Sequence, residues 1–170
     1  MFAYLKMPAF LAISLLFTAC SSNKQREQHS ELAMKDVTRL KTTPVKDQGP
    51  SQTCWIYAML ATIETEHIMR GDSVNLSVDY VSRMLIREKA AEHLASNEED
   101  YRSMRGVASN TLRLIQTYGL HHFDAYHSRH EVDYVTLMRK SISCMRTAFS
   151  YKSAMENVDE MLDKEISPLP

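Results

Sequence analysis

The stretch PVKDQGPSQTCWIYA, residues 44–58, is the part of the chain that says most about its fold, because a loop here runs directly into a helix. Proline and glycine interrupt its first half, which is typical of loops. Apolar residues then recur at helical spacing over residues 53–70, which predicts an amphipathic helix. We expect Thr53 to cap the first turn of this helix and Gly71 to follow its last turn. The apolar residues of its inner face are Ile56, Met59, Leu60, Ile63 and Ile68.

The chain beyond this helix also follows a helical pattern. Further helices are predicted over residues 78–95, 107–118, 131–149 and 155–166. We expect Ser77 to cap the first of them and Gly119 to end the second. The expected inward residues are Val81, Met84, Leu85 and Ala91 on the first and Leu112 and Ile115 on the second. Since only residues 119–123 suggest extended chain, the predicted fold class is mainly α.

Composition limits the classes of protein to which the chain can belong. Its 170 residues fit one domain, and a hydrophobic content of 44% suffices to bury a core. A formal net charge of -1 indicates no basic surface, so we expect no nucleic-acid partner. Three cysteines are too few for a disulfide-dense scaffold or a four-cysteine zinc site. Four glycines argue against a glycine-rich phosphate loop, and we expect neither a metal nor a cofactor.

The N-terminal region indicates export. Residues 1–19 hold a positive charge followed by an apolar run that is too short to span a bilayer comfortably, as in a signal peptide. The junction at Cys20 is similar to a bacterial lipobox, in which the cysteine becomes a lipidated N-terminus. We expect the protein to be exported and anchored to the cell-envelope membrane through Cys20, the alternative being an ordinary secretory signal with an incidental cysteine. Residues 20–40 are mostly polar and predict a tether, which leaves residues 41–170 as the folded domain.

Two residues of the opening stretch have the chemistry of a nucleophilic site. Cys54 falls in the first turn of the predicted helix, and a helix N-terminus favours the reactive thiolate form of a cysteine. Gln48 lies six residues earlier, and a side-chain amide held near a nucleophile can donate to a developing oxyanion. The alternative for a single cysteine is an inert, buried position.

The whole string resembles the papain-like cysteine peptidases, whose nucleophile region has Pro-Val-Lys-Asp-Gln-Gly, a short spacer, and then Cys-Trp on an apolar helix. By this resemblance Cys54 is the nucleophile and Gln48 is the glutamine of the oxyanion hole. Ser51 replaces the cysteine of the commonest pattern's disulfide, which is more similar to the bleomycin hydrolase and aminopeptidase C branch. Gln52 replaces a small glycine and is large enough to crowd the cleft.

The resemblance extends over about residues 42–126, and weakly to the C-terminus. Residues 75–81, NLSVDYV, are similar to the start of that branch's second helix, and residues 112–120 to a helix that ends in Tyr-Gly. The resemblance implies the helical, N-terminal half of a papain-like α+β fold. Its β-rich half is expected to be missing from these residues.

A cysteine nucleophile needs a base, which in papain-like enzymes is a His oriented by an Asn. The resemblance places that pair about 130–150 residues after the cysteine, beyond Pro170. We therefore expect a truncated or fragmentary chain that is inactive alone, or one that folds with a partner chain supplying the missing half. Four histidines in the chain are expected to be loop residues, with a metal site or a relocated base as the alternatives. They are His121, His122, His127 and His130.

The function expected from these residues is that of a papain-like cysteine peptidase acting on peptides or proteins. The alternative is a degenerate, non-catalytic binding module of the cell envelope. Cys144 lies on a predicted helix among Ile142, Met145 and Phe149, and we expect it to be a small apolar residue rather than a reactive thiol. A disulfide between Cys54 and Cys144 would consume the nucleophile and is not predicted.

Mass spectrometry of the mature N-terminus tests the export prediction. We expect residues 1–19 to be removed and Cys20 to carry lipid, because a short apolar run ends at a lipobox-like junction. The Cys20→Ser variant serves as the control and is expected to carry no lipid. An intact Met1, or a cut elsewhere with an unmodified Cys20, would contradict the prediction.

Overall fold

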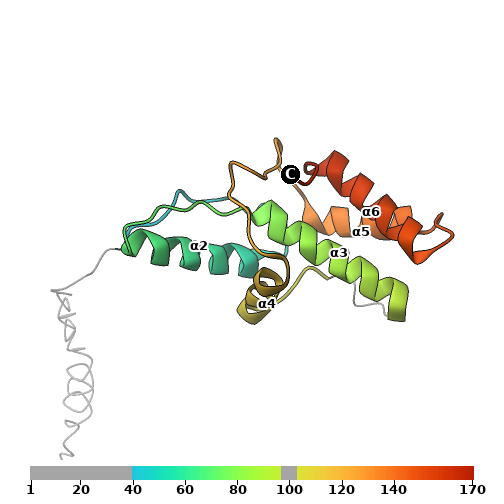
Figure 1. The fold of residues 1–170 in the computed structure, drawn as a ribbon, viewed down its shortest axis with the longest axis horizontal. Helices are drawn as coiled ribbons and strands as arrows, with labels where there is room; N and C mark the ends of the chain where they lie inside the picture. Colours follow the sequence, from blue (N-terminus) through green and yellow to red (C-terminus); the bar gives the residue numbers. More distant parts are fainter. Residues whose placement is uncertain (1–39, 97–102) are drawn as a thin grey trace, which may run out of the picture. The chain divides into compact units, whose positions relative to one another are not determined.

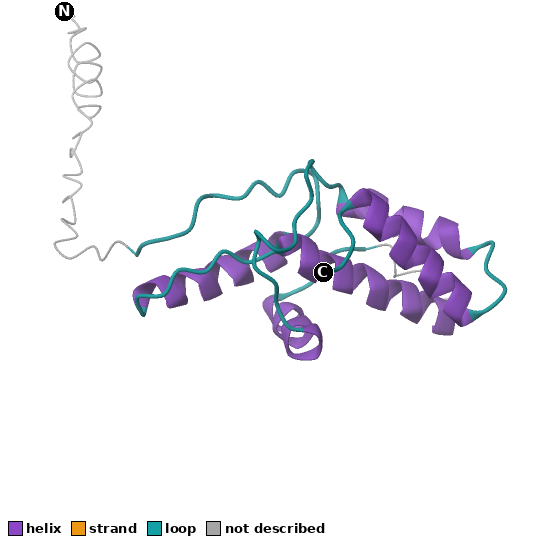
Figure 2. Ribbon diagram, turned by 45° about the horizontal axis from the view of Figure 1, so that its top comes forward, coloured by secondary structure: helices purple, strands orange, loops and turns teal. Residues whose placement is uncertain are grey.

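The computed structural model describes residues 40–96 and 103–170, which lie in one compact unit, Arg39–Pro170 (Figure 1). These residues form the helices α2 (Cys54–Met69), α3 (Val78–Ser96), α4 (Ala108–Tyr118), α5 (Tyr134–Met145) and α6 (Tyr151–Glu165). Within the described ranges the only β-type pairing is an antiparallel bridge between Leu76 and His122, and loops join the helices (Figure 2). The expected mainly helical fold is confirmed.

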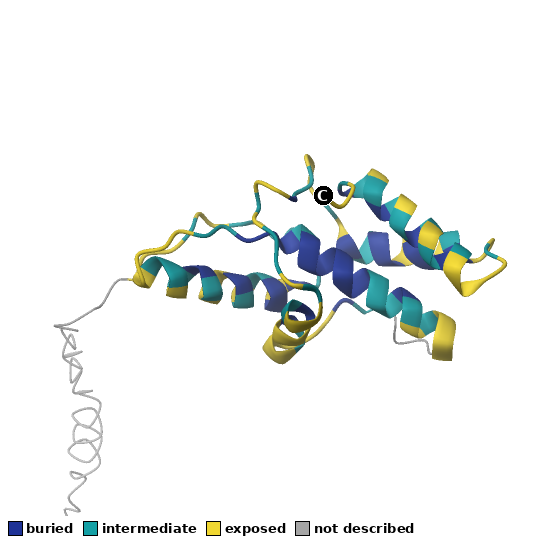
Figure 3. Cartoon of the chain, in the orientation of Figure 1, coloured by how far each residue is buried: buried dark blue, intermediate teal, exposed yellow. Residues whose placement is uncertain are grey.

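Helix α3 occupies the centre of the arrangement. It packs against α2 and α4 and also against α5 and α6, which form a helical hairpin with each other. The first part of α3 is buried on nearly all sides, as the dark blue ribbon in Figure 3 shows. Its buried apolar residues include Val81, Met84 and Leu85, which were expected to point inward. Helix α3 therefore joins the α2–α4 pair to the α5–α6 hairpin.

Three of the expected helix ends are confirmed. The Ser77 hydroxyl accepts a hydrogen bond from the Tyr80 backbone N–H at 3.0 Å and caps α3. Gly71 and Gly119 follow α2 and α4 with φ of +88° and +78°, a conformation that glycine adopts without steric cost.

Other expectations about single residues are wrong. Thr53 precedes α2, but its side chain makes no capping hydrogen bond, and its hydroxyl lies 2.8 Å from that of Ser51 instead. Leu112 is 44% exposed, whereas Thr111 and Leu114 are buried, so the inner face of α4 is rotated from the expected one. The apolar pattern missed this because Thr111 is polar and points inward beside Leu114.

The last two helices differ from the predicted ranges because two polar residues cap them. The Asp133 carboxylate accepts from the N–H groups of Val135 and Thr136, so α5 begins at Tyr134 rather than at residue 131. The Ser150 hydroxyl accepts from the Ser153 N–H at 3.1 Å and starts α6 before the predicted residue 155. Residues 146–150 form the turn between the two helices, so the prediction that the helix continues through residues 146–149 is wrong.

A buried carboxylate fastens the N-terminal loop to α2. Glu64 is 1% exposed, and its Oε1 atom lies 2.6 Å from Nζ of Lys46. The same oxygen accepts the Leu76 backbone N–H at 2.6 Å, and the other oxygen accepts from the Thr43 hydroxyl. Lys46 also donates to the Leu76 carbonyl at 2.9 Å. Glu64 thereby connects the loop before α2, α2 itself and the segment leading to α3.

A buried cation on α3, Arg83, connects this helix to the C-terminal part of the chain. Arg83 is 1% exposed, and its Nη2 atom lies 2.7 Å from the Asp163 carboxylate on α6. Its Nη1 atom donates to the Tyr126 hydroxyl at 3.1 Å and to the Ser167 carbonyl at 2.8 Å. The guanidinium therefore ties α3 to α6 and to the residues that follow it.

The Glu64→Gln substitution tests the importance of the buried carboxylate. We expect it to lower the free energy of unfolding by about 1.5–3 kcal/mol, because it leaves the Lys46 ammonium, whose side chain is 23% exposed, without its counter-ion. The measurement is urea denaturation followed by far-UV circular dichroism.

The matched control is Glu66→Gln on the same helix. Glu66 is exposed and pairs only with Arg70, at 3.5 Å, so we expect a loss below about 0.5 kcal/mol. Equal losses from the two substitutions would show that the buried pair has no special role.

Candidate active site

Cys54 is the first residue of α2, at the position where the sequence places the change from loop to helix. Its side chain is exposed, and its thiol is free. The unpaired N–H groups of the first turn and the helix macrodipole both favour negative charge at this position. The geometry therefore presents an exposed thiol at a helix N-terminus, where a substrate carbonyl can reach it.

The loop from Gln48 to Cys54 is held by a buried serine. The Ser51 hydroxyl donates to the Gln48 carbonyl oxygen at 2.6 Å, and the Ser51 backbone N–H approaches the same oxygen at 3.3 Å. The hydroxyl also lies 2.8 Å from that of Thr53. Ser51 stands where the commonest papain pattern has a disulfide cysteine, and here hydrogen bonds hold the loop at that position.

Gln48 is half-buried in the loop that precedes Cys54. Nε2 of Gln48 donates to the Ser51 carbonyl oxygen at 3.3 Å, which uses one of its two N–H bonds. Gly49 follows with φ of +54°, and a Cβ atom added there would stand 2.5 Å from Oε1 of Glu131. Only glycine fits this turn without displacing the Glu131 side chain.

The segment after residue 102 packs against the start of α2. Nε1 of Trp55 donates to the Met104 carbonyl at 2.9 Å, and Oε1 of Gln52 accepts from the Met104 N–H at 3.3 Å. A Cβ atom at Gly106 would lie 2.7 Å from the Trp55 ring. Gln52, expected to crowd the cleft, is thus held against Met104.

A cavity of about 280 Å³ lies beside Gln48. Its lining includes Tyr57 of α2, Tyr134 of α5, and His130 and Glu131 from the loop before α5. Cys54 is not part of this lining. The structure therefore brings Gln48 and His130 to one cavity but leaves Cys54 outside it.

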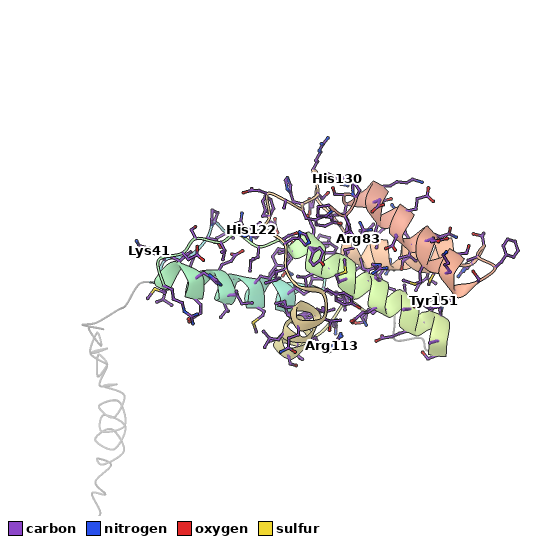
Figure 4. The ribbon with its side chains drawn as sticks, viewed as in Figure 1. Lys41, Arg83, Arg113, His122, His130 and Tyr151 are labelled. Atoms are coloured by element: carbon purple, nitrogen blue, oxygen red, sulfur yellow. The ribbon has the colours of Figure 1, made fainter. Side chains whose placement is uncertain are left out.

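Three of the four histidines between α4 and α5 contact residues of α3, of the segment before it or of their own loop. Nδ1 of His127 lies 2.7 Å from the Phe123 carbonyl, and the two rings stack with centroids 4.5 Å apart. The His121 ring lies 4.3 Å from the ring of Tyr80. His122 pairs with Leu76, and His122 and His130 are labelled in Figure 4. Each of these contacts is to a residue other than Cys54.

The described residues offer no metal centre. Within residues 40–96 and 103–170, no three side chains of His, Cys, Asp or Glu are grouped as metal ligands would be.

A buried polar network near the cavity was not anticipated from the sequence. Tyr134 donates to Oδ1 of Asp79, and Oδ2 of Asp79 accepts the Ser128 N–H at 2.6 Å. Burial, followed by the negative charge of Asp79, raises the pKa of Tyr134 far above its ordinary range. The same two causes raise the pKa of Tyr57. Asp79 pairs with residues about fifty positions away, so no local pattern could have identified the network.

Cys144 contrasts with Cys54. It is half-buried on α5, and its thiol donates to the Ser141 carbonyl at 3.1 Å. Burial raises the pKa of the Cys144 thiol, which disfavours the thiolate. Phe149, expected beside it on an apolar face, is instead fully exposed in the turn after α5.

Comparisons with known proteins do not identify the chain. No protein-family model and no curated protein matches it, and nothing found links it to the papain-like peptidases. Cys20 and the expected signal segment lie outside the described residues. In the part of the chain that the structure covers, no helix combines the length and apolar character needed to cross a membrane.

Competitive alkylation tests the difference between the two thiols. We expect iodoacetamide to label Cys54 at least about tenfold faster than Cys144 near neutral pH, because only the thiolate reacts, Cys54 is exposed at a helix N-terminus, and partial burial raises the pKa of the Cys144 thiol. Mass spectrometry of the two peptides after timed labelling gives the two rates. The Cys54→Ser variant should leave the slow Cys144 rate unchanged, and equal rates in the unsubstituted chain would count against a nucleophile at position 54.

Proposed function

We propose that the chain carries the nucleophile-bearing, helical part of a papain-like cysteine peptidase. The Cys54 thiolate would attack the carbonyl carbon of a peptide bond and form a thioester as the amine leaves. The observation that carries the proposal is the exposed thiol of Cys54 at the first position of α2, directly after the loop that carries Gln48. The substrate class is a peptide or an unfolded protein segment.

The exposed face of α2 supports this proposal. Over the two turns below Cys54, the exposed residues at helical spacing are Ala58, Ala61 and Thr62, which are small and uncharged; the exposed Glu66 follows one turn later. A face of this kind can pack closely against another element, and peptide clefts form between two such walls. The second wall would come from chain beyond these residues or from a partner chain.

Gln48 would stabilise the oxyanion that forms in the attack. Its hydrogen bond to the Ser51 carbonyl uses one of its two N–H bonds, so the second could be donated to an oxyanion. A preorganised donor of this kind contributes about 10²–10³ in rate. The hydrogen bonds of Ser51 order the loop between Gln48 and Cys54. The proposed rearrangement of the Gln48 amide toward the Cys54 thiol would therefore involve its side chain and not the loop backbone.

The proposed reaction also requires an imidazole. A base must accept the thiol proton and then protonate the leaving amine. His121, His122 and His127 contact other residues, and His130 lines the cavity from which Cys54 is absent. The base would therefore be supplied by the half of the fold that the resemblance places after residue 170, or by a partner.

A second function is favoured by the orientation of Gln48. The Gln48 amide donates to the Ser51 carbonyl, and Cys54 does not line the cavity beside Gln48. The same loop could therefore bind a peptide without cleaving it. This is the non-catalytic binding module on the cell envelope. In either case we propose export and anchoring through lipidated Cys20.

Peptide hydrolysis by two forms of the protein distinguishes these functions. The 170-residue chain is expected to hydrolyse no broad-specificity peptide faster than its Cys54→Ala variant, since general acid–base help of about 10²–10⁴ is missing. The second form is an extended protein, called the joined form. In it the chain is fused to the residues that the DNA downstream of codon 170 encodes, read in each of the three forward frames. If that DNA encodes a His and an Asn about 130–150 residues after Cys54, we expect the joined form to hydrolyse peptides.

Gln48→Ala and Gln52→Ala in the joined form separate catalysis from loop structure. We expect Gln48→Ala to lower kcat about 10²–10³-fold and Gln52→Ala to change it little, because only the first removes the proposed oxyanion donor. Downstream DNA without such a His and Asn, or a joined form that binds peptides and cleaves none, would contradict the peptidase and favour the binding module.

A further inference from the structure

The turn between α5 and α6 exposes two aromatic rings. We call residues 146–152 the hairpin tip. Phe149 is 103% exposed and Tyr151 is 61% exposed, and the ribbon there is yellow in Figure 3. Single exposed apolar residues are common on protein surfaces. Here two aromatic side chains stand two positions apart on one projecting turn, away from the core that α3 organises (Figure 1).

Cations flank the two rings. Arg146 follows the last residue of α5, Lys152 is the second residue of α6, and both are exposed. Lys152 is 3.8 Å from Glu156, and Arg146 takes part in no ion pair among the described residues. The hairpin tip itself, residues 146–152, contains no acidic side chain.

We propose that the hairpin tip binds the surface of a bilayer that contains anionic lipid. Aromatic rings favour the interface between headgroups and acyl chains, and lysine and arginine near an anionic surface add to the attraction. A convex tip can enter a fluid interface, whereas a protein partner would need a preformed hollow to receive Phe149. The charges of Arg146 and Lys152 complement those of the lipid phosphates.

The length of chain before the described residues allows this contact. From Cys20 to Leu40 the chain has twenty residues, which span at most about 70 Å when fully extended. A lipid on Cys20 would thus keep the domain within reach of the same membrane. The inference uses the proposed anchor, but it shares no residue with the proposed peptidase site.

The Phe149→Trp variant of the full chain, reconstituted in vesicles through its N-terminal region, tests the proposal. The vesicles contain phosphatidylglycerol and phosphatidylcholine, with or without bromine on the acyl chains, because bromine quenches a tryptophan that enters the interface. Trp55 is buried, and its contribution to the fluorescence is measured with the unsubstituted chain. Since Phe149 makes no core contact, this variant should keep the thermal unfolding midpoint of the parent.

The control is Leu112→Trp on α4, which lies apart from the hairpin tip in Figures 1 and 2. We expect bromolipid to quench the tryptophan at position 149 and not the one at position 112. Replacing both Arg146 and Lys152 by Gln should lower the ratio of membrane-bound to free hairpin tip about 30-fold. Each cation near an anionic surface contributes a factor of about five. Purely phosphatidylcholine vesicles should lower this ratio to a similar extent.

Equal quenching at positions 149 and 112 would overturn the proposal, because it would show no preferred orientation. No quenching at position 149 in anionic vesicles would overturn it as well. If the emission at position 149 then shifted on addition of lipid-free envelope protein, the hairpin tip would be assigned to a protein partner instead.

Discussion

The pairing of Lys46 with the buried carboxylate of Glu64 is the constraint on which the candidate site depends. An isolated buried carboxylate is costly, so Glu64 can stay inside only while Lys46, Thr43 and the Leu76 N–H reach it. Those partners come from the loop before α2 and from the segment before α3. The Lys46 side chain stands two residues before Gln48, and the same pair therefore places the proposed oxyanion donor beside the start of α2.

Ser51 and Trp55 complete the positioning that Glu64 begins. Ser51 holds the loop between Gln48 and Cys54 by hydrogen bonds, and Trp55 holds the segment around Met104 against the first turn of α2. Together the contacts surround Cys54 on the protein side and leave its thiol exposed to solvent. The arrangement is compatible with the proposed catalytic cysteine, whose substrate cleft would need a second wall from further chain or from a partner. It is equally compatible with a loop that binds a peptide without cleaving it.

Local patterns in the sequence predicted the helices well because their signals are local. Ser77, Gly71 and Gly119 mark helix ends through the conformations of single residues, and the structure confirms them. Thr53 was misjudged because its hydroxyl pairs with that of Ser51, two residues earlier, and not with a backbone N–H of α2.

The buried ionic groups could not be predicted in the same way. Arg83, like Glu64, is polar in the sequence and would be assigned to the surface by composition alone. Its place in the core depends on Asp163 and Ser167, about eighty residues further along the chain. Within the site, the position of Cys54 at a helix start follows from the sequence, whereas the direction of the Gln48 amide and the cavity beside it depend on the tertiary fold.

The central place of α3 has a consequence for the order in which the molecule assembles. Helices α5 and α6 are neighbours in the sequence and pack most extensively on each other, so their contacts close only a short loop. The contacts around Cys54 join residues far apart, as Trp55 and Met104 do across 49 positions. Short-range contacts form faster than long-range ones, because less chain entropy is lost before they form. The hairpin is therefore expected to assemble early on the folding pathway, and the surroundings of the thiol late.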